Sequence, residues 1–133
     1  MKQAIVLIAA LAGAGSLPLA VHFSPQNDSH EAGTAVLTAA NNATRITITI
    51  NNEPHEAIQP ANVHAGNCAF VEQIRYPLTN VRNGHSTTIV PISLHELTST
   101  PNVIVIQDSP ASLHAAKDYK YVSCAPITIS AQP

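Results

Sequence analysis

Aromatic and charged side chains are scarce in this sequence of 133 residues. It has no tryptophan, two phenylalanines and three tyrosines, and charged residues make up 11% of the chain. Its six Lys and Arg side chains, set against eight Asp and Glu, form no basic block. A nucleic-acid-binding surface needs clustered positive charge for phosphates and aromatic rings for base stacking. The composition therefore argues against a nucleic-acid partner.

Cysteine is also scarce, since Cys68 and Cys124 are the only two. Two cysteines in an exported chain most simply form one disulfide. A loop on the order of fifty residues gives such a bond a chain-entropy contribution of about 4 kcal/mol. The alternative, two free thiols that bind a metal, has no C-x-x-C spacing behind it. We therefore predict a structural disulfide.

The N-terminal segment lacks charge after Lys2 and continues as the apolar run "AIVLIAALAGAG". A positive residue, an apolar run and small residues beyond it are typical of a secretory signal. Ala14 fits the small-x-small cleavage rule best, and Ala20 is the alternative. No cysteine lies near these positions, so a lipid-modified N-terminus is not expected.

This interpretation divides the chain into three parts. We expect a signal peptide over residues 1–20, a flexible tether over residues 21–33 and one folded domain over residues 34–133. The mature protein would lie in the periplasm or outside the cell, with no stable membrane insertion after cleavage. An uncleaved membrane anchor over Ala4–Val21 is the alternative, weakened by the glycines and the proline inside that run.

Long amphipathic helices are absent from the pattern, and short alternating segments take their place. In "TRITITIN", residues 44–51, isoleucines face one side and threonines the other. "STTIVPISL" reaches Pro91, which cannot donate to a sheet ladder, so its strand lies at an edge or ends there. "NVIVIQ", residues 102–107, is a second strong strand. Ser93 can cap a helical turn over "SLHEL", and another short turn is expected from Ser109.

Further strands are expected in "TAVLT", "PANVHAGNC" and "YKYVSCAPITI". The sum is about six to eight short strands separated by turn signals. We therefore predict an all-β fold, an antiparallel Greek-key β-sandwich with short helical turns in its loops and one disulfide.

The stretch "PANVHAGNC" carries the best single candidate for a functional residue, His64. Asn62 and His64 alternate, so in a strand their side chains share a face. The simpler interpretation is a structural imidazole that is hydrogen-bonded to a backbone carbonyl or to Asn62. The alternative is a copper or zinc site.

A metal site would require the fold to gather scattered residues. The chain has seven histidines but no H-x-H and no H-x₃-H pair. The partners available to His64 are imidazoles and carboxylates, the usual ligands of zinc and copper together with thiolates. They are His55, His85, His95, His114, Glu53, Glu56 and Asp108. Of these, His85, His95 and His114 are named with His64 as the candidate metal ligands.

No arrangement of residues points to catalysis. Ser86 follows His85, but neighbours on a strand face opposite sides, and there is no G-x-S-x-G elbow. The close carboxylates Glu53 and Glu56 lie beside a turn. We name no catalytic residue and expect that the protein is not an enzyme.

Five segments between residues 58 and 129 share an order and spacing with a known group of proteins. They are "PANVHAGNC", "YPL", "GHSTTIVPISLHEL", "VIVIQDSP" and "YVSCAPI". They resemble small exported bacterial proteins whose fold is akin to the CHRD (chordin-type) domain and, more distantly, to copper/zinc superoxide dismutase. The resemblance implies a Greek-key sandwich outside the cytoplasm, in which a disulfide pins the loop after the histidine strand to the last strand. In the dismutase a similar bond occurs and an H-x-H strand holds copper.

The sequence departs from that pattern where a metal would bind. Asn62 stands in place of the first histidine, and Gln107 stands in place of the histidine of an I-x-V-H segment. Amide side chains are poor ligands for copper and zinc. Ala125 also replaces the glycine after the second cysteine. We expect a degenerate metal site.

The first hypothesis is therefore an exported, non-enzymatic β-sandwich module without a cofactor that binds a protein or an envelope component. The second is a periplasmic protein that binds copper or zinc through His64 and other histidines. If the strand "ITITI", residues 46–50, lies at a sheet edge, it would pair with a second copy and give a homodimer.

Overall fold

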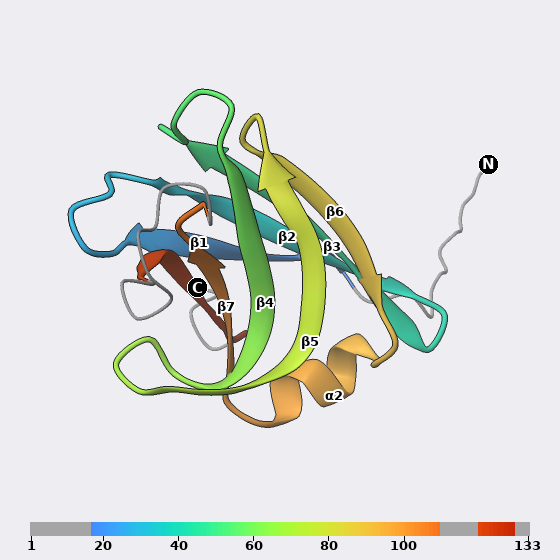
Figure 1. The fold of residues 1–133 in the computed structure, drawn as a ribbon. Helices are drawn as coiled ribbons and strands as arrows, with labels where there is room; N and C mark the ends of the chain where they lie inside the picture. The colour runs from blue at the N-terminus through green and yellow to red at the C-terminus, as the bar shows by residue number, and fades with distance from the viewer. Residues whose placement is uncertain (1–16, 110–119, 130–133) are drawn as a thin grey trace, which may run out of the picture.

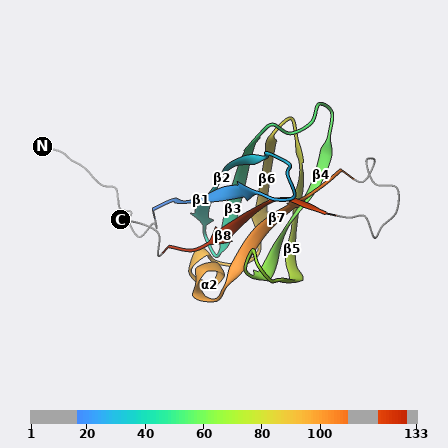
Figure 2. The same ribbon diagram turned by 90° about the vertical axis from the view of Figure 1, so that its left-hand side faces the viewer.

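The described part of the chain folds into a barrel of antiparallel strands with one short helix. The structure, a computed structural model, describes residues 17–109 and 120–129. Its elements are β1 (Leu19–Pro25), β2 (Ala32–Ala40), β3 (Ala43–Asn51), β4 (Ile58–Gly66), β5 (Val71–Arg82), β6 (His85–Val90), α2 (Leu94–Ser99), β7 (Asn102–Gln107) and β8 (Tyr121–Ile127). Figure 1 and Figure 2 show the strands wrapped around a common interior.

The sheet closes on itself in the order β1-β2-β3-β6-β5-β4-β7-β8. Closure occurs where the end of β1 meets β8, through the pairs Ser24↔Cys124 and Pro25↔Ser123. Strands β4, β5 and β6 follow one another as neighbours, and β3 lies beyond β6. The chain must therefore cross from β3 to β4 over the barrel, which is the Greek-key connection.

The predicted β-sandwich is wrong, although the all-β class and the disulfide are confirmed. An inward-facing apolar row looks the same in a sandwich and in a barrel, so the alternation does not separate them. The difference lies in β1, which pairs with both β2 and β8 and removes the open edges. The sequence pattern places the segment that forms β1 in the signal peptide and the tether.

Residues 21–33 belong to the barrel and do not form a tether, because most of β1 and the start of β2 lie there. Leu19, Val21 and Phe23 point into the core, while the residues between them are exposed. Residues 1–16, which make up most of the expected signal peptide, lie outside the described residues.

Several local predictions are confirmed. The isoleucines of β3 are buried, β7 has the predicted bounds, and β6 ends just before Pro91. Ser93 caps α2, accepting a hydrogen bond from the Glu96 amide at 3.1 Å. The helical turn expected from Ser109 falls mainly on residues outside the described part of the chain.

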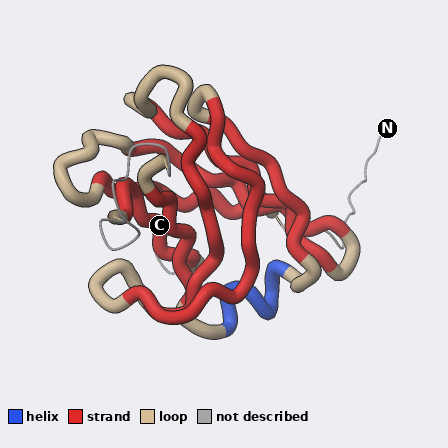
Figure 3. Tube along the Cα trace, in the orientation of Figure 1, coloured by secondary structure: helices blue, strands red, loops and turns tan. Residues whose placement is uncertain are grey.

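The core fills the barrel interior, and the two ends of the barrel differ. Residues such as Ile46, Ile48 and Ile104 are almost completely buried. The helix α2 lies across one end (Figure 3) and adds Leu94 and Leu97 to the same core. At the opposite end lie the loops 26–31, 52–57 and 83–84, and we call this the open end.

The strand expected to form a dimer edge has no free side. Strand β3 pairs with β2 along one side and with β6 along the other. A second copy that added to this strand would have to displace one of its neighbours. The structure therefore closes the edge-strand route to a homodimer through β3.

Candidate functional site

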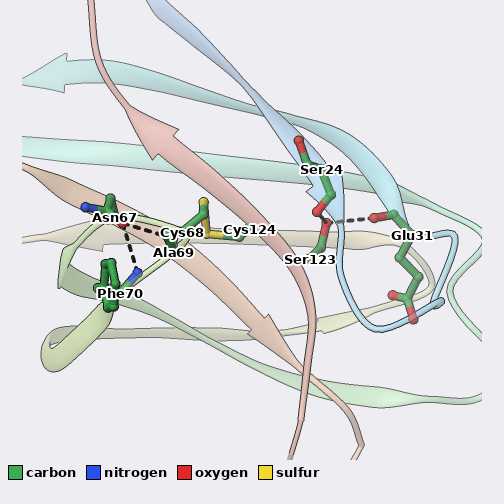
Figure 4. Close-up of a disulfide and its surroundings, with 8 residues drawn as sticks. All are labelled: Ser24, Glu31, Asn67, Cys68, Ala69, Phe70, Ser123 and Cys124. Atoms are coloured by element: carbon green, nitrogen blue, oxygen red, sulfur yellow. Dashed lines mark hydrogen bonds between the residues drawn. A yellow bond between two sulfur atoms is a disulfide. The ribbon is translucent and has the colours of Figure 1, made fainter.

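The predicted disulfide joins the loop after β4 to the middle of β8. Cys68 and Cys124 are bonded, with their Cα atoms 6.0 Å apart and 56 positions apart in sequence. Their side chains pack on the outer face of the barrel against Val103 and Val105 of β7. The bond thus holds a loop against the barrel wall (Figure 4). A disulfide is compatible with an oxidising, exported location.

Hydrogen bonds fix the conformation of this loop, residues Asn67–Phe70, which we call the disulfide turn. The backbone N–H of Asn67 donates to the carbonyl of Phe70 at 3.2 Å, and the reverse bond measures 3.1 Å. The side-chain Oδ1 of Asn67 accepts from the amides of Ala69 and Phe70, each at 2.9 Å (Figure 4). An asparagine that binds the backbone of the next residues in this way is an Asx turn.

Gly66 provides the backbone conformation that leads into the disulfide turn. Its φ is +101°, in the region that favours glycine, and an added Cβ would lie 2.4 Å from the Phe70 carbonyl oxygen. The amide of Gly66 donates to the Pro101 carbonyl at 3.2 Å. The turn is thus held before its start by Gly66, in its middle by the disulfide of Cys68, and at its end by the hydrogen bonds that Phe70 makes to Asn67.

The disulfide turn presents Phe70 to solvent. Phe70 is 75% exposed, whereas the other phenylalanine, Phe23, is buried in the core. Ile74, on the adjoining part of β5, is also exposed. Sequence reasoning missed Phe70, because the pattern after Cys68 loses its alternation and gave no face for this residue. Aromatic side chains are enriched in protein–protein interfaces, and this ring is exposed on a turn that covalent and hydrogen bonds fix.

His64 lies on the same outer face, beneath this region. It pairs with Val103 of β7 and Ile74 of β5, and it is 4% exposed. Its Nδ1 is 2.7 Å from the Glu72 carbonyl oxygen, which only accepts, so Nδ1 carries the hydrogen. Its ring meets Tyr121 edge-on, with centroids 6.2 Å apart. Its Nε2 is buried and, among the described residues, has no hydrogen-bond partner.

The structure does not bring the other candidate histidines to His64. His85 is exposed at the start of β6, near the open end. His95 is exposed on α2, at the other end of the barrel, where it lines a mostly apolar depression beside Leu94. His114 lies outside the described residues. Within residues 17–109 and 120–129, no three His, Cys, Asp or Glu side chains come together in a way that could hold a metal ion.

The two amide residues Asn62 and Gln107 share an outer face of the sheet with His64. Asn62 and His64 are alternate residues of β4 and pair with Val105 and Val103 of β7. Gln107 follows Val105 by two positions, so the alternation of a strand places it on the same face. It is buried. Asn62 is thus the nearer of the two to His64, whereas Gln107 lies four positions along β7 from Val103, the residue opposite His64.

Ser86 and His85 do not form a serine–histidine catalytic pair, because their side chains lie on opposite faces of β6. Ser86 is buried, and its hydroxyl donates to the Thr79 carbonyl of β5 at 2.6 Å. His85 is exposed on the opposite face of β6. The serine hydroxyl is thus used in joining β6 to β5.

The acidic candidates lie at the open end of the barrel. His55 and Glu56 are exposed there, with 3.8 Å between His55 Nε2 and Glu56 Oε2. Glu53 accepts a hydrogen bond from the Gly84 amide at 2.5 Å. Burial raises the pKa of Glu53 above its usual value, and this bond opposes the shift. A second carboxyl group, that of Glu31, is buried nearby and was not a candidate from the sequence.

Comparison with known proteins gives no match for this chain, whether to a protein-family model, to a curated protein or to a solved structure. Within residues 17–109 and 120–129, no helix has the length and apolar character that crossing a bilayer requires.

Proposed function

We propose that this chain is an exported, non-enzymatic β-barrel module that binds a protein or an envelope component through the disulfide turn. The observation that carries this proposal is the 75% exposure of Phe70 on a turn that a disulfide and an Asx turn hold in place. The protein would act in the periplasm or outside the cell, where such a bond persists.

Energetics favour a contact at this position. Burying the exposed part of a phenylalanine side chain yields about 2 kcal/mol from the hydrophobic effect. A flexible loop would lose part of that gain in ordering its residues on binding. The disulfide turn is already ordered, because both ends of Asn67–Phe70 are hydrogen-bonded and Cys68 is cross-linked to β8.

Binding of the purified mature protein to envelope fractions of the source cells tests the proposal. The variant Phe70→Ser removes the ring from an exposed position, so the fold should be retained. Ile89→Ser is the matched control, since Ile89 is an exposed apolar residue on β6, away from the turn. We expect Phe70→Ser to lower bound protein at least tenfold, as a loss of about 2 kcal/mol implies, and Ile89→Ser to leave it unchanged. Equal binding by all three proteins would refute the assignment.

The signal peptide belongs to the same proposal, and the position of β1 favours one of its two candidate cleavage sites. Cleavage after Ala20 would remove Leu19, a buried core residue, together with the start of β1. Cleavage after Ala14 would leave the whole strand. We therefore assign cleavage to Ala14, and the intact mass of the secreted protein measures the position directly. A mature protein that begins at Val21 would contradict this assignment.

A second candidate function, copper or zinc binding, is favoured by one observation at His64. Its Nδ1 faces the Glu72 carbonyl, and its Nε2 is left with a free lone pair. Metal-binding histidines are commonly oriented by a carbonyl in this way. The described residues do not complete such a site, because Asn62 and Gln107 are amides and no ligand group of three is present among them. The remaining candidate, His114, lies outside the described residues.

Thermal unfolding with added Cu²⁺ or Zn²⁺ separates the two functions. A metal-binding protein would be stabilised in proportion to the logarithm of free metal above its Kd. His64→Ala would remove that effect, whereas the exposed His95→Ala would keep it. A melting temperature that does not respond to either ion would leave the binding module as the function.

A further inference from the structure

Glu31 is buried at the open end of the barrel beside an amide partner. Glu31 is 2% exposed, and Gln59 of β4 is completely buried. Gln59 Nε2 donates a hydrogen bond to Glu31 Oε2 at 3.0 Å. Among the described residues, Glu31 Oε1 and Gln59 Oε1 are both buried without a hydrogen-bond partner. Both atoms are acceptors, and each costs free energy when it is buried without a donor.

One proton on Glu31 would satisfy both oxygens. A protonated carboxyl group becomes a donor, and Gln59 Oε1 is the unsatisfied acceptor on the residue that it already contacts. The acid and the amide would then exchange two hydrogen bonds, one in each direction. We propose that Glu31 is held protonated in the folded barrel and that its pair with Gln59 is a pH-sensitive latch at the open end.

The surroundings of Glu31 disfavour its charged form. Burial is the main cause that raises its pKa, and the hydrogen bond from Gln59 opposes this shift. The charged groups that act on Glu31 are Glu53, which follows β3, and Asp108, which follows β7. Both are acidic and raise the pKa further. The contacts from β8 and from the loop before β2 come from uncharged serines.

The latch joins three parts of the barrel. The Glu31 amide donates to Ser29 Oγ at 3.0 Å, and the Glu31 carbonyl accepts from Ser123 Oγ of β8 at 2.7 Å. The side chain of Glu31 contacts Gln59 of β4. Figure 4 shows Ser123 next to Cys124, so the same stretch of β8 holds Glu31 on one side and the disulfide on the other. Ionisation of Glu31 would loosen this end of the barrel next to the strand that anchors the disulfide turn.

The sign of the pH effect follows from the raised pKa. The folded protein keeps this proton at pH values where the unfolded chain, with a carboxyl pKa near 4.5, has lost it. The contribution of the latch to stability is complete below that pH and is lost as the pH rises through the folded-state pKa. Within this window one retained proton lowers the folding equilibrium constant about tenfold for each pH unit.

Urea unfolding of the full mature chain between about pH 4 and about pH 8 tests the latch. Glu31→Gln keeps the shape and offers Gln59 Oε1 an N–H donor at every pH. We expect the folding equilibrium constant of Glu31→Gln to fall less steeply with rising pH than that of the wild type. The difference between the two slopes should reach up to about tenfold per pH unit. Glu72→Gln, a change at an exposed carboxylate of β5, should follow the wild type. Parallel profiles for the wild type and Glu31→Gln would overturn the proposal.

A direct readout on the unmutated protein covers the case in which Glu31→Gln fails to fold. Assigned carbonyl ¹³C shifts of labelled glutamate side chains should show that the Glu31 carboxyl group remains protonated while the exposed glutamates are ionised, with Glu53 as the other glutamate whose pKa is raised. Ionisation of Glu31 near pH 4.5 would refute the latch, whatever the behaviour of Glu53. Stabilisation by Ca²⁺ at pH 8 that Glu31→Gln abolishes would also overturn it, because the unpaired oxygens would then be cation ligands.

Discussion

Removal of the disulfide should cost this barrel a large part of its stability. The bond closes a loop of 56 positions, and the chain-entropy relation gives about 4 kcal/mol for that length. A domain of this size is stable by about 5–15 kcal/mol, so the loss is large but need not unfold the protein. The suitable variant is Cys68→Ser with Cys124→Ala, since Cys124 is buried and a serine there would leave a hydroxyl without a partner.

The assay is urea unfolding followed by far-ultraviolet circular dichroism, because the chain has no tryptophan for fluorescence. The oxidised protein, the reduced protein and the double variant are compared. We expect the reduced protein and the variant to lose about 4 kcal/mol each. Their urea dependence should also steepen, because an unfolded chain without a cross-link exposes more surface. A loss below about 1 kcal/mol in both would refute the view that the bond constrains the unfolded chain.

Three further changes have defined outcomes. Gly66→Ala should destabilise the barrel by about 1–3 kcal/mol in the same assay, because φ is +101° and the new Cβ would meet the Phe70 carbonyl; a neutral effect would contradict the assigned turn. Leu97→Ala should cost about 2–5 kcal/mol, since Leu97 is fully buried where α2 closes the barrel, whereas the exposed His95→Ala should be close to neutral. Glu53→Gln should reduce the loss of stability as the pH rises above about 4.5, since burial raises the pKa of Glu53; an unchanged pH profile would contradict that shift.

The sequence was sufficient for the strands whose residues alternate strictly. In β3 the isoleucines of "ITITI" face the core as predicted, because a half-buried strand forces that period. Pro91 has no N–H to donate to the sheet ladder, and β6 ends just before it. The hydroxyl of Ser93 caps the start of α2. These are local effects, so a local pattern reveals them.

The closure of the barrel depends on a long-range pairing that no local pattern reveals. Leu19, Val21 and Phe23 do alternate, but the apolar run before them favours a signal peptide over a strand. Without β1, the remaining strands leave free edges, as a sandwich does. The pairing of β1 with β8, which lies about 100 residues later, is what separates the two folds.

The candidate site likewise has a part that the sequence predicted and a part that it did not. The number of cysteines predicted the bond, because Cys68 and Cys124 are the only two and leave one pairing. The exposure of Phe70 was not predictable, since it results from the way the bond folds the loop back onto the outer face of the barrel. Glu31 gave no signal either, because a single glutamate in a polar stretch is ordinarily solvated. Its burial is a product of contacts with Gln59 and Ser123, which come from distant strands.

Site-specific photo-crosslinking in living cells tests the central claim most directly. A photoreactive phenylalanine analogue placed at Phe70 is compared with the same analogue at Ile89, in the oxidised protein and in the variant without the disulfide. The account predicts a discrete adduct from position 70 that is absent from position 89 and lost without the disulfide. An adduct of equal yield from both positions, or none from position 70 in the oxidised protein, would contradict it.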